Sequence, residues 1–111
     1  MPATYDDANL VVQILRWGAD IGLDEATGAL FADGFDPEGA DAHDPSVRTM
    51  LQFGEVVGTL VKQGVLDRGL VLDLWWISGS WARVGPAARR ERERLDEPRL
   101  YENFEALAAT A

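Results

Sequence analysis

The stretch "DPSVRTMLQFGEVVGTLVKQG", residues 44–64, has the pattern of one amphipathic helix. On a helical wheel its apolar residues share one broad face, and the polar and charged side chains hold the other. Asp44 can cap the first turn, and Pro45 at the first helical position gives up an N–H that would have no partner there. We therefore predict a core-facing helix from Pro45 to about Gly64. Its apolar face holds Val47, Met50, Leu51, Phe53, Gly54, Val57, Gly58, Leu60 and Val61.

Two glycines on this face, Gly54 and Gly58, need a physical reason. Each glycine inside a helix costs about 1 kcal/mol relative to alanine. They lie one turn apart, so the absence of two β-carbons lets another helix or a flat ring approach the backbone closely. We predict that a tryptophan ring covers them.

A short turn follows this helix. Gly64 suits the left-handed position past a helix end, and Asp67 suits the N-cap of the next helix. Because helices joined by so short a turn pack as antiparallel neighbours, we predict a central helical hairpin of residues 45–64 and 67–84. The second helix should pause just before Pro86, since the residue preceding a proline disfavours the helical region.

The stretch "LWWISGSW", residues 74–81, contains three of the four tryptophans. On a wheel through the predicted helix, Trp75 and Trp81 fall on the core face, where aromatic residues at helical spacing serve packing. The opposite side holds Leu72, Asp73, Trp76, Gly79, Ser80 and Arg83. Trp76 is therefore expected outside the core, where a solitary monomer has no evident use for it.

Three explanations for the pair Leu72 and Trp76, with Gly79 beside them, remain open. The acidic loop or the C-terminal segment folds back and covers them, or they form a contact patch for another chain, or they belong to a small-ligand site. Aromatic residues are enriched at interface centres, and symmetric dimers are the commonest soluble assembly.

The remaining segments also indicate helices. Thr4 and Asp7 resemble a capping box, and apolar residues at helical spacing follow them. Gly22 and then Asp24, as an N-cap, indicate a short second helix that ends near residues 33–34. Pro98 precedes a last short helix. The apolar stripes are Leu10, Ile14, Trp17 and Ile21 in the first helix, and Leu100, Phe104 and Leu107 in the last.

Residues 34–44 combine glycine, proline and acids without periodicity, which indicates a loop. No strand pattern of period two is present. We predict one all-α domain over residues 1–111, with four to five helices in a compact bundle or orthogonal array.

Composition excludes several classes of function. The net charge is −9, and residues 1–46 hold ten acids against one base, so nucleic-acid binding is not expected. No apolar run is long enough to cross a bilayer, and "MPATYDDANL" has acids where a secretory signal has bases, so we expect a cytoplasmic protein without a membrane role. The absence of cysteine excludes disulfides, thiolate catalysis and the usual zinc sites.

Few residues indicate catalysis. His43 is the sole histidine and lies in the acidic loop; we interpret it as a surface residue rather than a metal ligand or pH switch. No nucleophile–base pair, calcium loop or phosphate loop is recognisable, and we expect no cofactor and no metal. The cluster "RRERER", residues 89–94, is interpreted as a solvated helical face, or as the partner of an acidic surface such as this chain's N-terminal half.

Residues "RTMLQFGEVVGTLVKQGVLD" with Glu55, Gly64 and Asp67, then Trp81, then "YENFEALA" at residues 101–108, resemble an uncharacterised family of bacterial helical domains of unknown function. The resemblance covers about residues 47–108. Many members of that family look tethered to a membrane through an N-terminal helix, which this sequence does not show. Glu55 has no capping duty of its own in the middle of a helix. We expect its carboxylate to accept hydrogen bonds from the C-terminal segment, from Tyr101 or an arginine.

The sequence thus predicts a non-catalytic protein-interaction or scaffold domain. We expect it to self-associate as a homodimer through the face around Trp76, or to dock another protein there. The alternative is a small-molecule-binding or sensor domain with a tryptophan-lined pocket. An enzyme that uses a pair of its 19 carboxylates stays a third, weaker hypothesis.

Overall fold

Six α-helices make up the part of the chain that the computed structural model describes, residues 2–110. The all-α prediction is confirmed, and no strand is found in these residues. The predicted number of helices, four to five, was too low. The helices are α1 (Tyr5–Asp20), α2 (Leu23–Leu30), α3 (Pro45–Lys62), α4 (Arg68–Leu74), α5 (Ile77–Leu95) and α6 (Glu102–Ala109).

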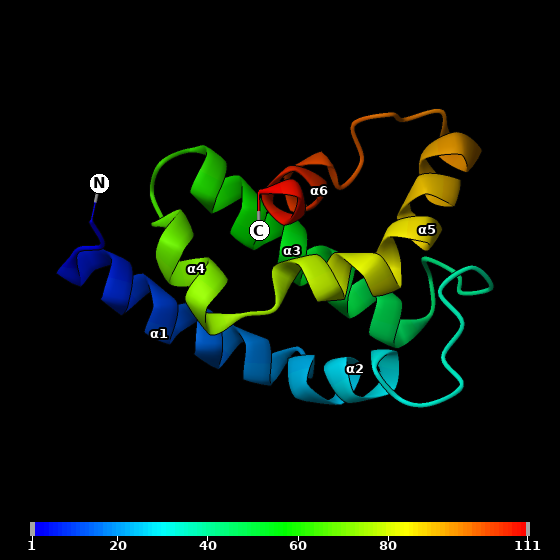
Figure 1. Cartoon of the computed structure of the whole chain (residues 1–111), viewed down its shortest axis with the longest axis horizontal. Coiled ribbons are helices and arrows are strands. Elements are labelled where there is room, and N and C mark those ends of the chain that lie inside the picture. The colour runs from blue at the N-terminus through cyan, green and yellow to red at the C-terminus, as the bar shows by residue number, and fades with distance from the viewer. Residues whose placement is uncertain (1, 111) are drawn as a thin grey trace.

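Helix α3 runs through the middle of the molecule (Figure 1). It packs against α2, α5 and α6, and α1 joins the layer formed by α2. The predicted apolar face of α3 contributes to the core of the domain. Most residues of this face are buried, and Leu60 and Val61 are half-buried. Helix α3 makes its most extensive contacts with α6 and α2 rather than with α4. The predicted hairpin of residues 45–64 and 67–84 is therefore not the main packing unit.

The two glycines of α3 admit α6, not a tryptophan. A β-carbon on Gly54 would overlap the ring of Phe104, and one on Gly58 would overlap the backbone of Asn103. The predicted close approach is therefore present, but the predicted tryptophan cover is wrong. The indole of Trp81 lies one layer further out, edge-on to Phe104 with ring centroids 5.1 Å apart.

The Glu55 carboxylate lies between these glycines and caps the start of α6. It accepts hydrogen bonds from the backbone N–H groups of Asn103 and Phe104, both at 2.9 Å, and from Asn103 Nδ2 at 3.0 Å. The expectation of bonds from the C-terminal segment holds, but the donors are not Tyr101 or an arginine. Tyr101 instead precedes α6 in the left-handed conformation, φ 60°, and its side chain makes no cap. A negative charge from α3 thus serves the helix N-terminus in place of a local cap.

The turn between α3 and α4 has the predicted form. Gly64 adopts φ 77°, the Val65 N–H donates to the Leu60 carbonyl at 3.1 Å, and Asp67 accepts from the Leu70 N–H at 2.9 Å. The predicted capping box of Thr4 and Asp7 is also present. Asp7 has a further duty, because its carboxylate accepts the backbone N–H of Asp67 at 2.9 Å and so joins the starts of α1 and α4.

Two predicted caps were wrong. The Asp44 carboxylate accepts from the Asp41 N–H at 3.0 Å within the preceding loop and makes no bond to the first turn of α3. Helix α2 begins directly after Gly22, whose φ of 77° needs a glycine, so Asp24 lies inside the helix rather than at its cap. Asp44 still occupies the N-cap position of α3, and Pro45 is the first helical residue, as predicted.

The predicted helix 67–84 is broken at Trp75 and Trp76. Trp75 is extended, with φ −129° and ψ 142°, and α5 begins at Ile77. Consecutive side chains point to opposite sides in an extended segment, so the two indoles reach different partners. Trp75 meets Phe53 edge-on at 5.6 Å, and Trp76 stacks on Phe31 at 5.3 Å.

The predicted pause before Pro86 is also wrong, because α5 continues through it to Leu95. Pro86 removes the hydrogen bond to the Ala82 carbonyl. Ala82 is exposed, whereas Val84, Ala87 and Ala88 on the other side are buried. The helix therefore loses one bond on its solvent side and keeps its packed face.

Removing the Glu55 carboxylate should destabilise the fold. We expect Glu55→Ala to lower the free energy of unfolding by roughly 1.5–3 kcal/mol, because two backbone N–H groups of α6 lose a charged acceptor. Glu55→Gln keeps one acceptor oxygen and should lose less. Urea unfolding followed by circular dichroism measures both. Glu93→Ala, on the exposed side of α5, is the control; an equal effect of Glu55→Ala and Glu93→Ala would contradict the capping role.

Candidate functional site

An apolar pocket of about 330 Å³ lies between α2, α3 and the junction of α4 and α5. Five of the residues that line it are aromatic, and the others include apolar side chains such as Leu23, Met50 and Ile77. No lining side chain is charged. The five aromatic residues are Phe31, Phe53, Trp75, Trp76 and Phe104.

The elements that build the pocket follow from the fold. Gly54 has no side chain, so the ring of Phe104 reaches the wall from α6. Phe53 of α3 is held between Trp17, stacked at 5.6 Å, and Trp75, edge-on at 5.6 Å. The break between α4 and α5 allows Trp75 to line the interior while Trp76 turns outward.

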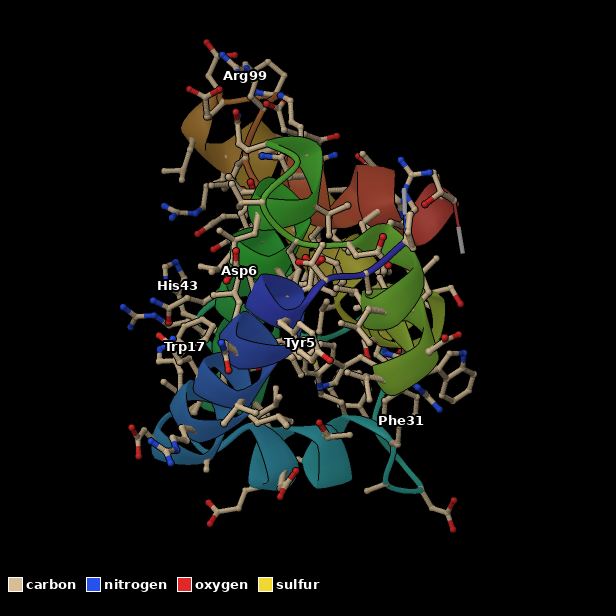
Figure 2. All side chains as sticks on the ribbon, turned by 90° about the vertical axis from the view of Figure 1, so that its left-hand side faces the viewer. Tyr5, Asp6, Trp17, Phe31, His43 and Arg99 are labelled. Carbon is tan, nitrogen blue, oxygen red and sulfur yellow. The ribbon has the colours of Figure 1, made fainter. Side chains whose placement is uncertain are left out.

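Trp76 stands at the mouth of the pocket. Its side chain is 68% exposed and stacks on Phe31 with an angle of 18° between the rings. The guanidinium of Arg83 lies 5.2 Å from the centre of the Phe31 ring. In Figure 2 Phe31 lies at the end of α2, far from Arg99, which marks the segment between α5 and α6.

Gly79 supports the indole of Trp76. A β-carbon at this position would overlap the indole, so the glycine allows the ring to lie against the first turn of α5. Leu72 has a different place: it is half-buried and packs against the core. Leu72 and Trp76 do not share a helix, because α4 ends at Leu74, although both line a shallow depression of about 410 Å³.

Two polar side chains line the pocket. The Thr27 hydroxyl donates to the Leu23 carbonyl at 2.8 Å. Ser80 is only 9% exposed, and no hydrogen bond within residues 2–110 uses its hydroxyl. Ser80 was predicted to lie on the polar side of the helix, and this prediction is wrong. The break at Trp75 and Trp76 changes the phase of α5 and turns Ser80 inward.

Part of this site could be predicted from the sequence. Trp75 and Trp76 were singled out, and the exposure of Trp76 was expected. Phe31 and Ser80 were missed as pocket residues. No local pattern indicates either one, because Phe31 meets Trp76 only through the tertiary packing of α2, and the orientation of Ser80 depends on the helix break.

A second polar cluster joins the acidic loop to α5. Glu91 is 7% exposed, and its carboxylate pairs with His43 Nε2 at 2.8 Å and Arg94 Nη2 at 3.0 Å. His43 is an exposed loop residue, as expected, and also part of this ion pair. Arg90 donates to the Ala40 carbonyl. The basic cluster of α5 therefore contacts this chain's own N-terminal half, and Glu91 is buried rather than solvated.

The hydrogen bonds from Arg94 hold the pKa of Glu91 below its ordinary value of 4.5, and the nearby charges of Arg94 and His43 act in the same direction. Because this pKa is lower in the folded than in the unfolded chain, ionised Glu91 stabilises the fold above pH 4.5. The contribution is lost as the pH falls below 4.5 through the folded-state pKa. In Figure 2 His43 and Phe31 lie on opposite sides, so this cluster is separate from the pocket.

Replacing Glu91 should remove this part of the pH dependence. We expect Glu91→Gln to be less stable than the wild type at neutral pH, with the difference shrinking as the pH falls below 4.5. Unfolding by urea at a series of pH values measures the difference. Glu93→Gln, exposed on the same helix, should show no such trend. A difference that stays constant down to acid pH would contradict the role of the carboxylate charge.

No group of three or more His, Cys, Asp or Glu side chains within residues 2–110 is placed to hold a metal ion. None of the helices there combines the length and apolar character needed to span a membrane.

Within residues 2–110 these features define a small domain of six helices, built on a glycine-containing central helix, with an aromatic pocket. The chain belongs to the family of the domain of unknown function DUF4760, whose model matches residues 8–111. The predicted resemblance is thereby confirmed, and it extends beyond residues 47–108. Comparison with curated proteins and with solved structures finds no match.

Proposed function

We propose that this domain is a non-catalytic binding domain that holds a small, mainly apolar molecule in the pocket beneath Trp76. The observation that carries the proposal is the aromatic pocket itself. Its volume of about 330 Å³ falls in the range of small-molecule sites, roughly 300–1,000 Å³, which are mostly apolar with a few placed polar groups. The two hydroxyls of Thr27 and Ser80 are the polar groups here.

The chemistry of the lining supports binding without catalysis. General acid–base catalysis needs a titratable side chain within hydrogen-bond reach of the reacting group. The residues that line this pocket include no carboxylate, histidine, lysine or tyrosine. The cluster of His43 and Glu91 lies outside the pocket, and its Glu91 carboxylate is already paired with His43 and Arg94.

Filling the pocket should abolish binding. Gly28 lines the pocket, and a β-carbon there meets no atom within 4 Å, so Gly28→Leu should place a side chain in the opening without disturbing the fold. With prodan, a neutral two-ring naphthalene dye whose emission shifts to shorter wavelength in apolar surroundings, we expect saturable binding to the wild type. We expect binding at least roughly tenfold weaker to Gly28→Leu, because the side chain occupies the space of the dye.

Ala29→Leu is the matched control, since Ala29 is exposed on the same helix and does not line the pocket. It should bind the dye as the wild type does. Failure of the wild type to bind, or equal binding by Gly28→Leu, would contradict the proposed function.

A second candidate function is self-association through Trp76. One observation favours it: the exposed indole stands beside Leu74, which is 49% exposed, so two large apolar side chains meet the solvent together. Aromatic side chains at such positions are frequent anchors of protein interfaces. The break after α4 means that this patch consists of Leu74 and Trp76, rather than the face of Leu72, Trp76 and Gly79 that the sequence indicated.

Sedimentation separates the two candidates. If the chain self-associates through this patch, Trp76→Ala should weaken the dimer by roughly tenfold or more, because an anchoring aromatic side chain is lost. Val65→Ala changes an exposed apolar residue in the turn before α4 and should leave the dimer unchanged. A wild-type chain that stays monomeric at all concentrations, or a dimer indifferent to Trp76→Ala, would exclude this candidate.

A further inference from the structure

We propose that the pocket takes an uncharged planar molecule of about two fused rings that carries one hydroxyl or carbonyl group, and that the Ser80 hydroxyl binds this group. The inference rests on the proposed function and specifies its ligand. Three features of the lining carry it: the absence of charge, the arrangement of the rings, and the unused hydroxyl.

The lining excludes a charged ligand. A charged group that enters an apolar site loses its hydration, and the cost is large unless an opposite charge meets it there. No side chain that lines the pocket carries a charge. The nearby Arg83 lies over the ring of Phe31 and is not among the lining residues, so it offers no partner inside.

The rings favour a planar ligand of limited size. Phe53 and Trp75 meet edge-on, and Phe31 and Trp76 stack, so the pocket presents both ring faces and ring edges. Aromatic ligands match such walls through stacked and edge-on contacts. An apolar cavity of about 150 Å³ accepts benzene, so a pocket of about 330 Å³ accommodates roughly twice that volume, which corresponds to two fused rings.

Ser80 supplies the point of polar recognition. Ser80 is nine-tenths buried, and its backbone N–H donates a hydrogen bond to the Trp76 carbonyl at 3.0 Å. Its hydroxyl has no hydrogen-bond partner in residues 2–110. Its oxygen is not among the enclosed side-chain atoms that lack a partner in these residues, so the hydroxyl is accessible from the pocket, where a ligand that brings a donor or an acceptor can bond to it. Of the two hydroxyls in the lining, that of Thr27 already donates to its own helix, so the Ser80 hydroxyl is the one left for the ligand.

The test compares three probes of the same ring system: naphthalene, 2-naphthol, and the anion 2-naphthoate. Chemical-shift titration at pH 7 measures their affinities. We expect 2-naphthol to bind about threefold to tenfold more tightly than naphthalene, because one hydrogen bond is added. We expect 2-naphthoate to bind at least roughly tenfold more weakly than 2-naphthol, because its charge has no partner.

Ser80→Ala identifies the residue. It should remove the advantage of 2-naphthol over naphthalene and leave the affinity for naphthalene unchanged. Ser78→Ala, an exposed serine of the same helix outside the pocket, is the control and should change neither. The Ser80 hydroxyl makes no bond within the fold, so its removal should not unfold the chain.

The outcomes distinguish this inference from the proposed function. If none of the three probes binds, the proposed function itself fails. If the probes bind but 2-naphthoate matches 2-naphthol, or Ser80→Ala leaves the preference for 2-naphthol intact, the assigned ligand chemistry is overturned while the binding function stands.

Discussion

Helix α6 lies against α3 where Gly54 and Gly58 have no side chains, and the Glu55 carboxylate accepts the first free backbone N–H groups of α6. Neither half of this arrangement suffices alone. Without the glycines the two backbones could not approach, and without the carboxylate the N–H groups of Asn103 and Phe104 would lose their acceptor at the half-buried start of α6. The pocket depends on the same contact, because it brings the ring of Phe104 over Gly54 and completes one wall.

Much of the fold could be predicted because the signals were local. The amphipathic pattern of α3, the capping box at Thr4 and the glycine turn at Gly64 each depend on a few neighbouring residues, and each is present. The break at Trp75 could not be predicted in this way. Its extended conformation is held by contacts of the two indoles with residues of α2 and α3, so its cause lies far along the chain. The predicted pause before Pro86 was wrong for the opposite reason. There the tertiary packing of α5 outweighs the local tendency of a proline to interrupt a helix.

The candidate site shows the same division. Trp76 was expected outside the core and is exposed, although the continuous helix from which this followed does not exist. Gly79 was placed beside the indole in a contact patch, whereas in the structure it is the surface on which the indole lies. Ser80 lay on the wrong side of the wheel because the break changes the phase of the helix after it. A helical wheel is informative only as far as the helix is continuous, and the candidate site of this chain lies where the helix is interrupted.

The cap that Glu55 gives to α6 spans 48 residues of sequence. A ribosome delivers the acceptor long before the donors, so the groove over Gly54 and Gly58 stays open on the nascent chain until residues 102–109 have emerged. Helix α6, eight residues long, is too short to persist by itself in water, so it completes the domain only by docking. The closing of the core therefore has to wait for the synthesis of α6, and a chain that stops before α6 carries an unfilled apolar seam.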